Sequence, residues 1–271
     1  MNNLTRFRVA PVTTTEAKLN IFAPLDKLNP QNYQIETTVY EDDKHRVAVS
    51  GIRLTQLHRD ILDIALFHGD YKLESEIEEN IPVRTFSLYK IQEHLQHKQR
   101  HNAEWLKEKF AELKRATILI EYKEDDEDIE FNIIRVAKRS HKLGEYVLVL
   151  EELYMAFFKK EIGIDYKELL PDILSLQHAQ TKAVVRYMLS HQAGHKINVD
   201  KLLRKIGVQG GQRNLEYHRN QVLEELEEVG SKFNIELVKT TDDKRRKGDI
   251  TLVYTKHEKI NIYHPNQPTL F

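Results

Sequence analysis

The feature that most constrains the fold is a succession of four patterns in the C-terminal third of the chain. A short apolar-periodic run is followed by a glycine-containing stretch, a longer apolar-periodic run and two β-rich runs. These patterns predict a short helix, a turn, a longer helix and a β-hairpin. They occupy Val199–Ile206, Gly207–Gly211, Arg213–Val229, and Ile235–Val238 together with Ile250–Tyr254.

The tip of the predicted hairpin is strongly basic. It carries Lys244, Arg245, Arg246 and Lys247, and Lys239 precedes them. The order of the four elements is that of a winged helix-turn-helix, in which the hairpin is the wing. A basic wing tip indicates that the partner is the phosphate backbone of a nucleic acid. Most charge runs are only solvated surface, so the position of this run at a wing tip is what supports the interpretation.

Composition sets the remaining limits. The 271 residues, 40% of them apolar and 31% charged, describe a globular chain of about two domains. The net charge is −1, so any attraction to DNA must be local. The sequence has no cysteine, which excludes disulfides and thiolate chemistry. It shows neither an apolar run long enough for a membrane helix nor a secretory signal, so we expect a cytoplasmic protein outside the membrane.

A second unit with the same order of elements is predicted upstream. Its hairpin tip, Glu124–Asp128, is acidic, which argues against contact of this wing with phosphate. No residue-level repeat relates the two units, so the similarity is one of architecture. The unit comprises Thr85–Ser87, a helix over Leu88–Gln96, a helix capped by Asn102 that ends at Arg115, and strands over Thr117–Tyr122 and Ile129–Val136.

Further elements are expected around the two units. They are a hairpin over Tyr33–Tyr40 and His45–Ser50, a buried helix over Thr55–His68, a strand over Tyr146–Leu150, and helices over Glu151–Lys160 and Leu176–His191. We therefore expect an α+β protein with two tandem winged helix-turn-helix domains. Its segments are an irregular N-terminal arm (1–30), a first winged-helix domain with dimer, partner and auxiliary DNA contacts (31–165), a second winged-helix domain as the main DNA reader (166–258), and a flexible tail (259–271).

The residues expected to contact DNA lie mainly in the second domain. The first turns of the second helix reach base edges in the major groove, while the wing follows the backbone. Arg, Asn and Gln side chains make bidentate contacts with guanine or adenine. The groove candidates are Gln212, Arg213, Asn214, Tyr217, His218, Arg219 and Gln221, and the wing candidates are Lys239, Lys244, Arg245, Arg246 and Lys247. A winged helix used only for protein contacts is the alternative.

Basic residues of the first domain are auxiliary candidates, although its acidic wing makes a dimer or partner surface an alternative of nearly equal weight. The candidates are Lys98, Arg100, His101, Asn102, Lys107, Lys109, Lys114 and Arg115, with Lys138, Arg139, His141 and Lys142 as a second patch.

Two groups of histidines have a spacing that could bind zinc, but no carboxylate or cysteine completes a ligand set. No phosphate-binding glycine motif is present, and no nucleophile has a partner base. We therefore expect no metal, no cofactor and no catalytic residue. The histidine groups are His94, His97 and His101, and the pair His191 and His195.

The C-terminal peptide Gln267-Pro268-Thr269-Leu270-Phe271 combines a polar residue with two apolar anchors. Such a peptide is a plausible docking segment, with Gln267, Leu270 and Phe271 as the contacts. It resembles the peptide by which bacterial replication proteins bind the sliding clamp. A frayed tail is an equally good interpretation.

Three segments, taken in order, resemble plasmid replication initiators of the TrfA type, which are related in architecture to the RepE and π initiators. They are Ile52–Phe67, Asn102–Tyr122 and Leu176–Val208. The resemblance implies binding to directly repeated double-stranded origin DNA (iterons), opening of an AT-rich region, and recruitment of the host initiator, replicative helicase and sliding clamp. It also implies a monomer–dimer equilibrium and no ATPase or nuclease activity. In the TrfA type the clamp peptide lies toward the N-terminal side, whereas here the candidate is C-terminal.

A plasmid replication initiator is therefore the function that the sequence favours. A winged-helix transcriptional regulator that represses its own gene is the alternative. A third reading is an assembly protein that uses both winged domains as protein interfaces.

Overall fold

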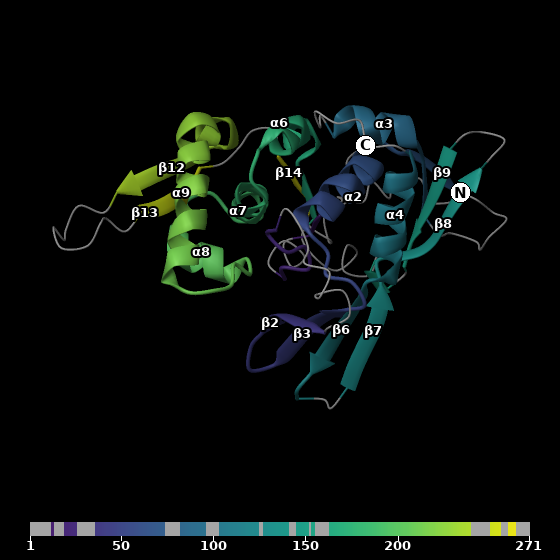
Figure 1. Ribbon diagram of the computed structural model, residues 1–271, viewed down its shortest axis with the longest axis horizontal. Helices are drawn as coiled ribbons and strands as arrows, with labels where there is room; N and C mark the ends of the chain where they lie inside the picture. Colours follow the sequence, from purple (N-terminus) through teal and green to yellow (C-terminus); the bar gives the residue numbers. More distant parts are fainter. Residues whose placement is uncertain are drawn as a thin grey trace.

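The structure, a computed structural model, describes residues 12–13, 19–25, 36–73, 82–95, 103–124, 127–140, 145–151, 153–154, 163–239, 250–255 and 260–263. Helices and antiparallel sheets alternate along the chain, so the fold is α+β, as the sequence predicts. Figure 1 shows a first half (residues 37–154), which contains most of the strands, beside a second half (163–255), which is mainly helical. No helix in the described ranges is long and apolar enough to cross a membrane.

The first half combines two sheets with a group of helices. In chain order it contains β2 (Thr37–Glu41), β3 (His45–Ser50), α2 (Gln56–His68), β4 (Asp70–Leu73), β5 (Pro82–Ser87), α3 (Leu88–His94), α4 (Ala103–Arg115), β6 (Thr117–Tyr122), β7 (Glu127–Asn132), β8 (Ile134–Ser140) and β9 (Glu145–Leu150). The sheet orders are β2-β3-β6-β7 and β4-β5-β9-β8, and every neighbouring pair is antiparallel.

One β-rich run serves both sheets of the first half. The sequence predicts a single strand over Ile129–Val136, but the structure divides this run at Ile133. β7 pairs with β6 on one side of the break, and β8 pairs with β9 on the other. Ile133 and Ile134 are both buried, so the alternation of one exposed and one buried residue stops there and the chain changes sheets. The wing-like hairpin β6–β7 consequently extends the β2–β3 hairpin rather than pairing with β5.

The second half follows the predicted order closely. It contains β10 (Gly163–Asp165), a 3-10 turn (Lys167–Leu169), α6 (Leu170–Ser175), α7 (Ala179–Leu189), β11 (Lys196–Asn198), α8 (Val199–Lys205), α9 (Gln212–Val229), a second 3-10 turn (Gly230–Phe233), β12 (Ile235–Lys239) and β13 (Ile250–Tyr254). The strands β11, β13 and β12 form one antiparallel sheet in that order. Helix α7 begins at Ala179, three residues after the expected start, because Leu176 has an extended backbone at the end of α6.

A third sheet joins distant parts of the chain at the boundary between the halves. Here β1 (Val12–Thr13) and β14 (Asn261–Tyr263) pair with opposite edges of β10. We call β1-β10-β14 the junction sheet. The sequence predicts an irregular arm and a flexible tail there, and it gives no indication of these two strands, because their partners lie far away in the sequence.

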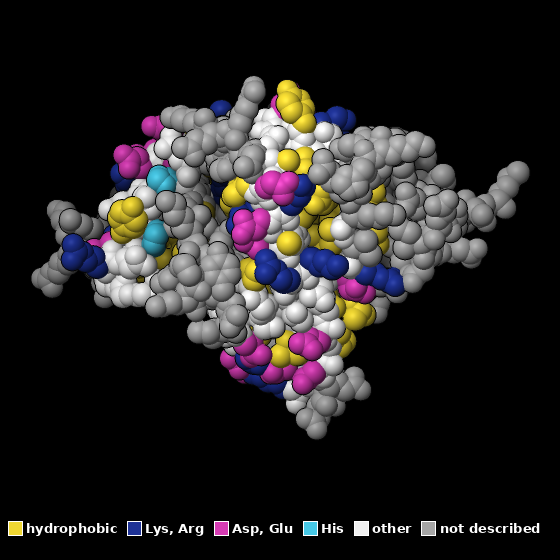
Figure 2. All heavy atoms as spheres, turned by 45° about the vertical axis from the view of Figure 1, so that its right-hand side comes forward, with side chains coloured by type: hydrophobic (Ala, Val, Ile, Leu, Met, Phe, Trp, Pro, Cys, Tyr) yellow, Lys and Arg dark blue, Asp and Glu magenta, His cyan; other side chains and the backbone are white. Residues whose placement is uncertain are grey.

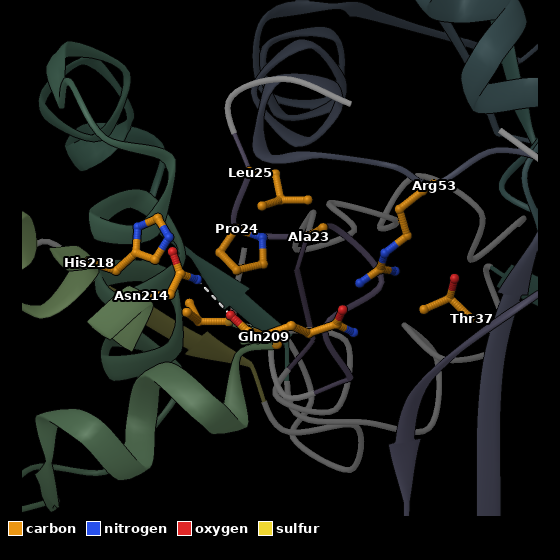
Figure 3. Close-up of a pocket in the computed structure, with 10 residues that line it drawn as sticks. Ala23, Pro24, Leu25, Thr37, Arg53, Gln209, Asn214 and His218 are labelled. Atoms are coloured by element: carbon orange, nitrogen blue, oxygen red, sulfur yellow. Dashed lines mark hydrogen bonds between the residues drawn. The ribbon is translucent and has the colours of Figure 1, made fainter. Parts of the chain in front are cut away.

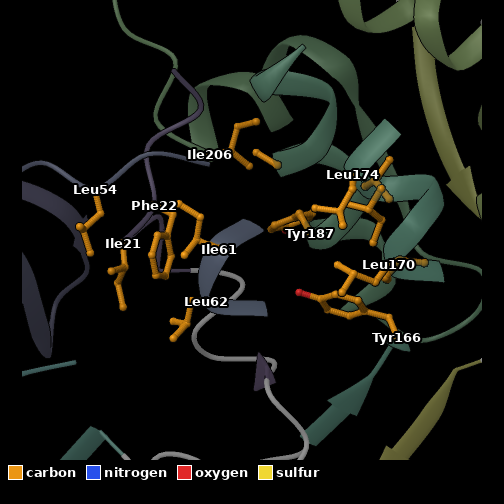
Figure 4. Packing of buried hydrophobic residues seen from close by; sticks show 14 of the residues in the cluster. Ile21, Phe22, Leu54, Ile61, Leu62, Tyr166, Leu170, Leu174, Tyr187 and Ile206 are labelled. Atoms are coloured by element: carbon orange, nitrogen blue, oxygen red, sulfur yellow. The ribbon is translucent and has the colours of Figure 1, made fainter. Parts of the chain in front are cut away.

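Residues 19–25, the N-terminal segment, also lie between the halves. The Ala23 N–H donates to the Leu54 carbonyl (2.8 Å), and the Asn20 side-chain amide donates to the Lys205 carbonyl at the end of α8. Ile21 and Phe22 are buried in a core shared by both halves. In Figure 4 they lie near Ile61 of α2, with residues of the second half beyond. The segment therefore packs the two halves together.

Helix α2 carries an unusual amount of buried charge because the second half covers it. Asp60 pairs with Lys182 (2.5 Å) and with Arg186 (2.6 Å), both on α7. Asp63 pairs with the same Arg186 (2.9 Å) and with Arg59 (2.7 Å). All five side chains are buried. Burial lowers the pKa of Arg186, but the two carboxylates outweigh burial and leave that pKa raised. We call this group the α2–α7 charge network.

We expect Arg186→Met to lower the free energy of unfolding by about 3–5 kcal/mol, because Asp60 and Asp63 would lose a cation that they share away from water. Chemical denaturation monitored by circular dichroism measures this change. The matched control is Arg204→Met on the exposed face of α8, for which a change within about 0.5 kcal/mol is expected. Equal effects of the two substitutions would show that the network does not stabilise the fold.

Candidate nucleic-acid interface

Local capping fixes the geometry of the unit formed by α8, the following turn and α9. The Asn198 side chain accepts a hydrogen bond from the Lys201 N–H (3.2 Å) and so caps the first turn of α8. Gly207 and Gly210 have φ angles of +92° and +103°, which L side chains rarely adopt. The Asn214 side-chain amide donates to the Gln209 carbonyl across the turn (2.6 Å). These contacts set the direction in which α9 leaves the turn.

Helix α9 presents one face to the core and one to the surface. Leu215, Val222, Leu223 and Leu226 are buried, and this spacing is that of an amphipathic helix. Its opposite face begins with exposed Gln212 and Arg213 and continues to Tyr217, whose side chain is 59% exposed. A large exposed aromatic side chain in this position is available to a partner.

Several predicted groove residues already have contacts within the protein. Arg219 pairs with Asp200 of α8 (3.0 Å), and the Gln221 amide donates to the Tyr217 hydroxyl (3.1 Å). Gln212 donates to Glu216 one turn along α9 (3.3 Å). No sequence pattern indicated this role of Asp200, whose carboxylate neutralises part of the positive charge of Arg219.

His218 lies on a different side of α9 from Arg213 and Tyr217. Its ring is partly buried, and with Asn214 it lines a cavity at the boundary with the first half (Figure 3). The structure thus divides the seven groove candidates between the open face, the turn, α8 and this cavity.

The hairpin that the sequence predicts as a wing is described only at its base. Strands β12 and β13 pair from Ile235–Tyr254 to Lys239–Ile250, and Lys239 is exposed at the end of β12. The basic tip, Lys244, Arg245, Arg246 and Lys247, lies outside the described residues, as do Gln267, Leu270 and Phe271 of the tail. These assignments stay predictions.

In the first half, two of the described candidates pair with neighbouring carboxylates, whereas Lys114 and Arg115 are exposed at the end of α4. Lys107 pairs with Glu104, and Lys109 pairs with Glu112 (2.7 Å). Burial raises the pKa of Glu112, but hydrogen bonds from His58 and Lys109 outweigh it and leave the pKa lowered. Both lysines therefore have part of their charge neutralised on their own helix. Lys98, Arg100, His101 and Asn102 lie outside the described ranges.

The β2-β3-β6-β7 sheet also balances its own charges. Arg46 pairs with Glu36 and Glu121, and Lys123 pairs with Glu41 (2.8 Å). The lower end of the molecule in Figure 2, where this sheet lies, accordingly shows acidic and basic side chains side by side. This surface lacks the excess of positive charge that a phosphate backbone requires.

The histidines form stacked pairs. His191 stacks on His195 with ring centroids 3.9 Å apart, and His94 stacks on His68 at 4.0 Å. Burial, with nearby His94 and two lysines, lowers the pKa of His68 to about 4. No cluster of three potential metal ligands occurs among the described residues. His97 and His101 lie outside that part of the chain.

The fold belongs to a known α+β arrangement. The chain superposes on a crystal structure of domain 2 and domain 3 of RctB with a TM-score of 0.57, covering 95% of this chain and 100% of that one. The sequences are 13% identical, so the likeness concerns the fold. No protein-family model matches the sequence, and no curated protein matches it.

The glycine turn between α8 and α9 can be tested by substitution. We expect Gly210→Ala to destabilise the protein by about 1–2 kcal/mol, because an L residue is strained at positive φ. A Cβ at Gly210 would also come within 3.2 Å of the Asn214 side chain. Thermal unfolding measures the change. Gly211→Ser is the control, since Gly211 caps α9 with φ −76° and serine is a favoured cap; a comparable loss there would contradict the proposed role of the turn.

Proposed function

We propose that the protein is a replication initiator that binds directly repeated double-stranded origin DNA, promotes opening of the origin and recruits host replication proteins. The observation that carries the proposal is the α8–turn–α9 unit followed by the β12–β13 hairpin, with the exposed start of α9 beside it. In winged helices these are the elements that enter the major groove and follow the backbone. RctB, whose domains share the fold, is a replication initiator.

The second half is proposed as a winged helix and as the main DNA reader. The strand order β11-β13-β12 places the hairpin beside the helix-turn-helix, and the groove residues Arg213 and Tyr217 are exposed. The first half is proposed as the winged domain for dimer and partner contacts, because several of its described cations, among them Arg46, Lys107 and Lys109, pair with carboxylates. No catalytic step is part of the proposal, and neither a metal nor a cofactor is required.

A winged-helix transcriptional regulator is the second candidate, since its DNA-reading unit would have the same form. The two candidates differ in the DNA that they require. An initiator binds several short direct repeats beside an AT-rich stretch, whereas an autorepressor binds its own promoter. Binding to DNA with direct repeats, compared with the promoter fragment alone, separates them. Absence of direct repeats near the gene removes most of the support for the initiator.

We expect the double substitution Arg245→Ala with Arg246→Ala to reduce the dependence of log affinity on log salt concentration by roughly 2 units, because two phosphate contacts are lost. Fluorescence anisotropy on repeat-bearing DNA over a range of salt concentrations measures the slope. The control is Lys44→Ala with Lys123→Ala, which removes two cations from the ion-paired sheet of the first half and should leave the slope unchanged. An unchanged slope for the wing variant would mean that the wing is not on DNA.

The C-terminal peptide is proposed to bind the sliding clamp. Replacing Leu270 and Phe271 by alanine is expected to abolish binding to purified clamp, because the two apolar anchors would no longer fill a pocket. DNA affinity of the same variant should equal that of the wild type, since the peptide is not assigned to DNA. Undiminished clamp binding, measured by surface plasmon resonance, would exclude this role.

A further inference from the structure

A cavity of about 200 Å³ lies between the two halves, beside the start of α9, and is partly open to solvent. Figure 3 shows residues from both halves and from the N-terminal segment around it. The lining consists of Ala23, Pro24, Leu25, Thr37, Arg53, Gly207, Val208, Gln209, Asn214 and His218. None of these side chains is acidic, and two are basic. We call this space the inter-half cavity.

Arg53 places a positive charge at one end of the inter-half cavity. Its guanidinium donates to the carbonyls of Asn20 (3.3 Å) and Ile21 (3.4 Å). Within the described ranges no carboxylate lies at ion-pair distance from it. Burial lowers the pKa of Arg53 to about 10, so the group is still charged at neutral pH. A half-buried cation without a counter-charge is partly desolvated at a cost, and an anion in the cavity would reduce that cost.

At the end of the inter-half cavity opposite Arg53 lie residues of the turn before α9 and of α9 itself. His218 Nδ1 is buried and has no hydrogen-bond partner among the described residues. In Figure 3 the side chain of Gln209 extends toward the end of the cavity where Arg53 lies. Helix α9 begins at Gln212, next to the cavity, and the positive end of an 18-residue helix adds to the field there. Guanidinium, imidazole and amide groups are together the donors that bind a phosphate group.

We propose that the inter-half cavity binds a phosphate group of the DNA strand that α9 contacts. The proposal rests on the proposed DNA binding and assigns Arg53, a residue of the first half, to the DNA-reading surface of the second half. A backbone phosphate is favoured over a free phosphate because Asn214 and His218 line the cavity and belong to the first turns of α9. The cavity is therefore lined by hydrogen-bond donors from both halves.

The first test is the affinity for repeat-bearing DNA at several salt concentrations. We expect Arg53→Gln to weaken binding about tenfold and to lower the salt slope by about 1. Lys44→Ala is the control; it removes an exposed cation that pairs with Glu124 at a hairpin tip of the first half and should change neither quantity. If Arg53→Gln bound the DNA with the affinity and the salt dependence of the wild type, the proposal would be overturned.

A second pair of variants leaves Arg53 and its backbone contacts intact. Gln209→Glu introduces a negative charge into the cavity without changing the size of the side chain, and Gln209→Ala removes the amide alone. Gln209 is exposed and its carbonyl, not its side chain, supports the turn, so both variants should fold, as thermal unfolding would verify. We expect Gln209→Glu to weaken DNA binding about tenfold and Gln209→Ala to have a much smaller effect. If Gln209→Glu and Gln209→Ala weakened DNA binding equally, the cavity would not be an anion site.

Calorimetric titration with inorganic phosphate distinguishes the source of the ligand. One outcome is that inorganic phosphate binds the wild type but not Arg53→Gln, while DNA affinity does not depend on Arg53. The ligand of the cavity would then be a free phosphate, and the assignment to a DNA phosphate would be overturned. Failure of Arg53→Gln to affect either ligand, while Arg213→Ala weakens DNA binding, would overturn this proposal and leave the proposed function intact. Wild-type protein that binds phosphate but no DNA would instead contradict the proposed function.

Discussion

The placement of the two halves depends on the pairing of Asp60 and Asp63 with Lys182 and Arg186. Two carboxylates on α2 are buried where water cannot solvate them, and α7 supplies the cations that balance them. Such a group adds little net stability compared with an apolar contact, but it tolerates little displacement, because each charge requires its partner within hydrogen-bond distance. The apolar core around Ile21 and Phe22 would allow small shifts between the halves. The charge network specifies one arrangement among them.

That arrangement brings together residues with no relation in sequence. Arg53 follows the β2–β3 hairpin of the first half, and Asn214 lies in the first turn of α9, yet both line one cavity. A single half would present only one end of this space. The inter-half cavity is thus built from residues of both halves, and its shape would change if the halves moved relative to each other. The α2–α7 charge network therefore influences the surface around α9 without contacting it.

The sequence predicted those parts of the fold that local patterns determine. The helix Thr55–His68 and the succession from α8 to β13 were predicted within a few residues, because apolar periodicity, asparagine caps and turn glycines act over short distances. The division of β7 from β8 at Ile133 and the junction sheet were not predicted, because strand pairing depends on residues far apart in the chain. The burial of Asp60 and Asp63 was also missed, since charged residues on a helix usually indicate an exposed face.

For the candidate site, apolar periodicity predicted the exposed face of α9 at Arg213. The pairing of Arg219 with Asp200 and the position of Arg53 could not be predicted, because they depend on tertiary contacts.

The junction sheet links the two ends of the described chain to the strand that connects the halves. β1 and β14 each pair with β10, so the backbone near Val12 and the backbone near Ile262 are held about one strand spacing from Ile164 on either side. A force on β1 or on β14 would therefore act directly on β10, at the boundary between the halves, through the backbone hydrogen bonds that pair these strands.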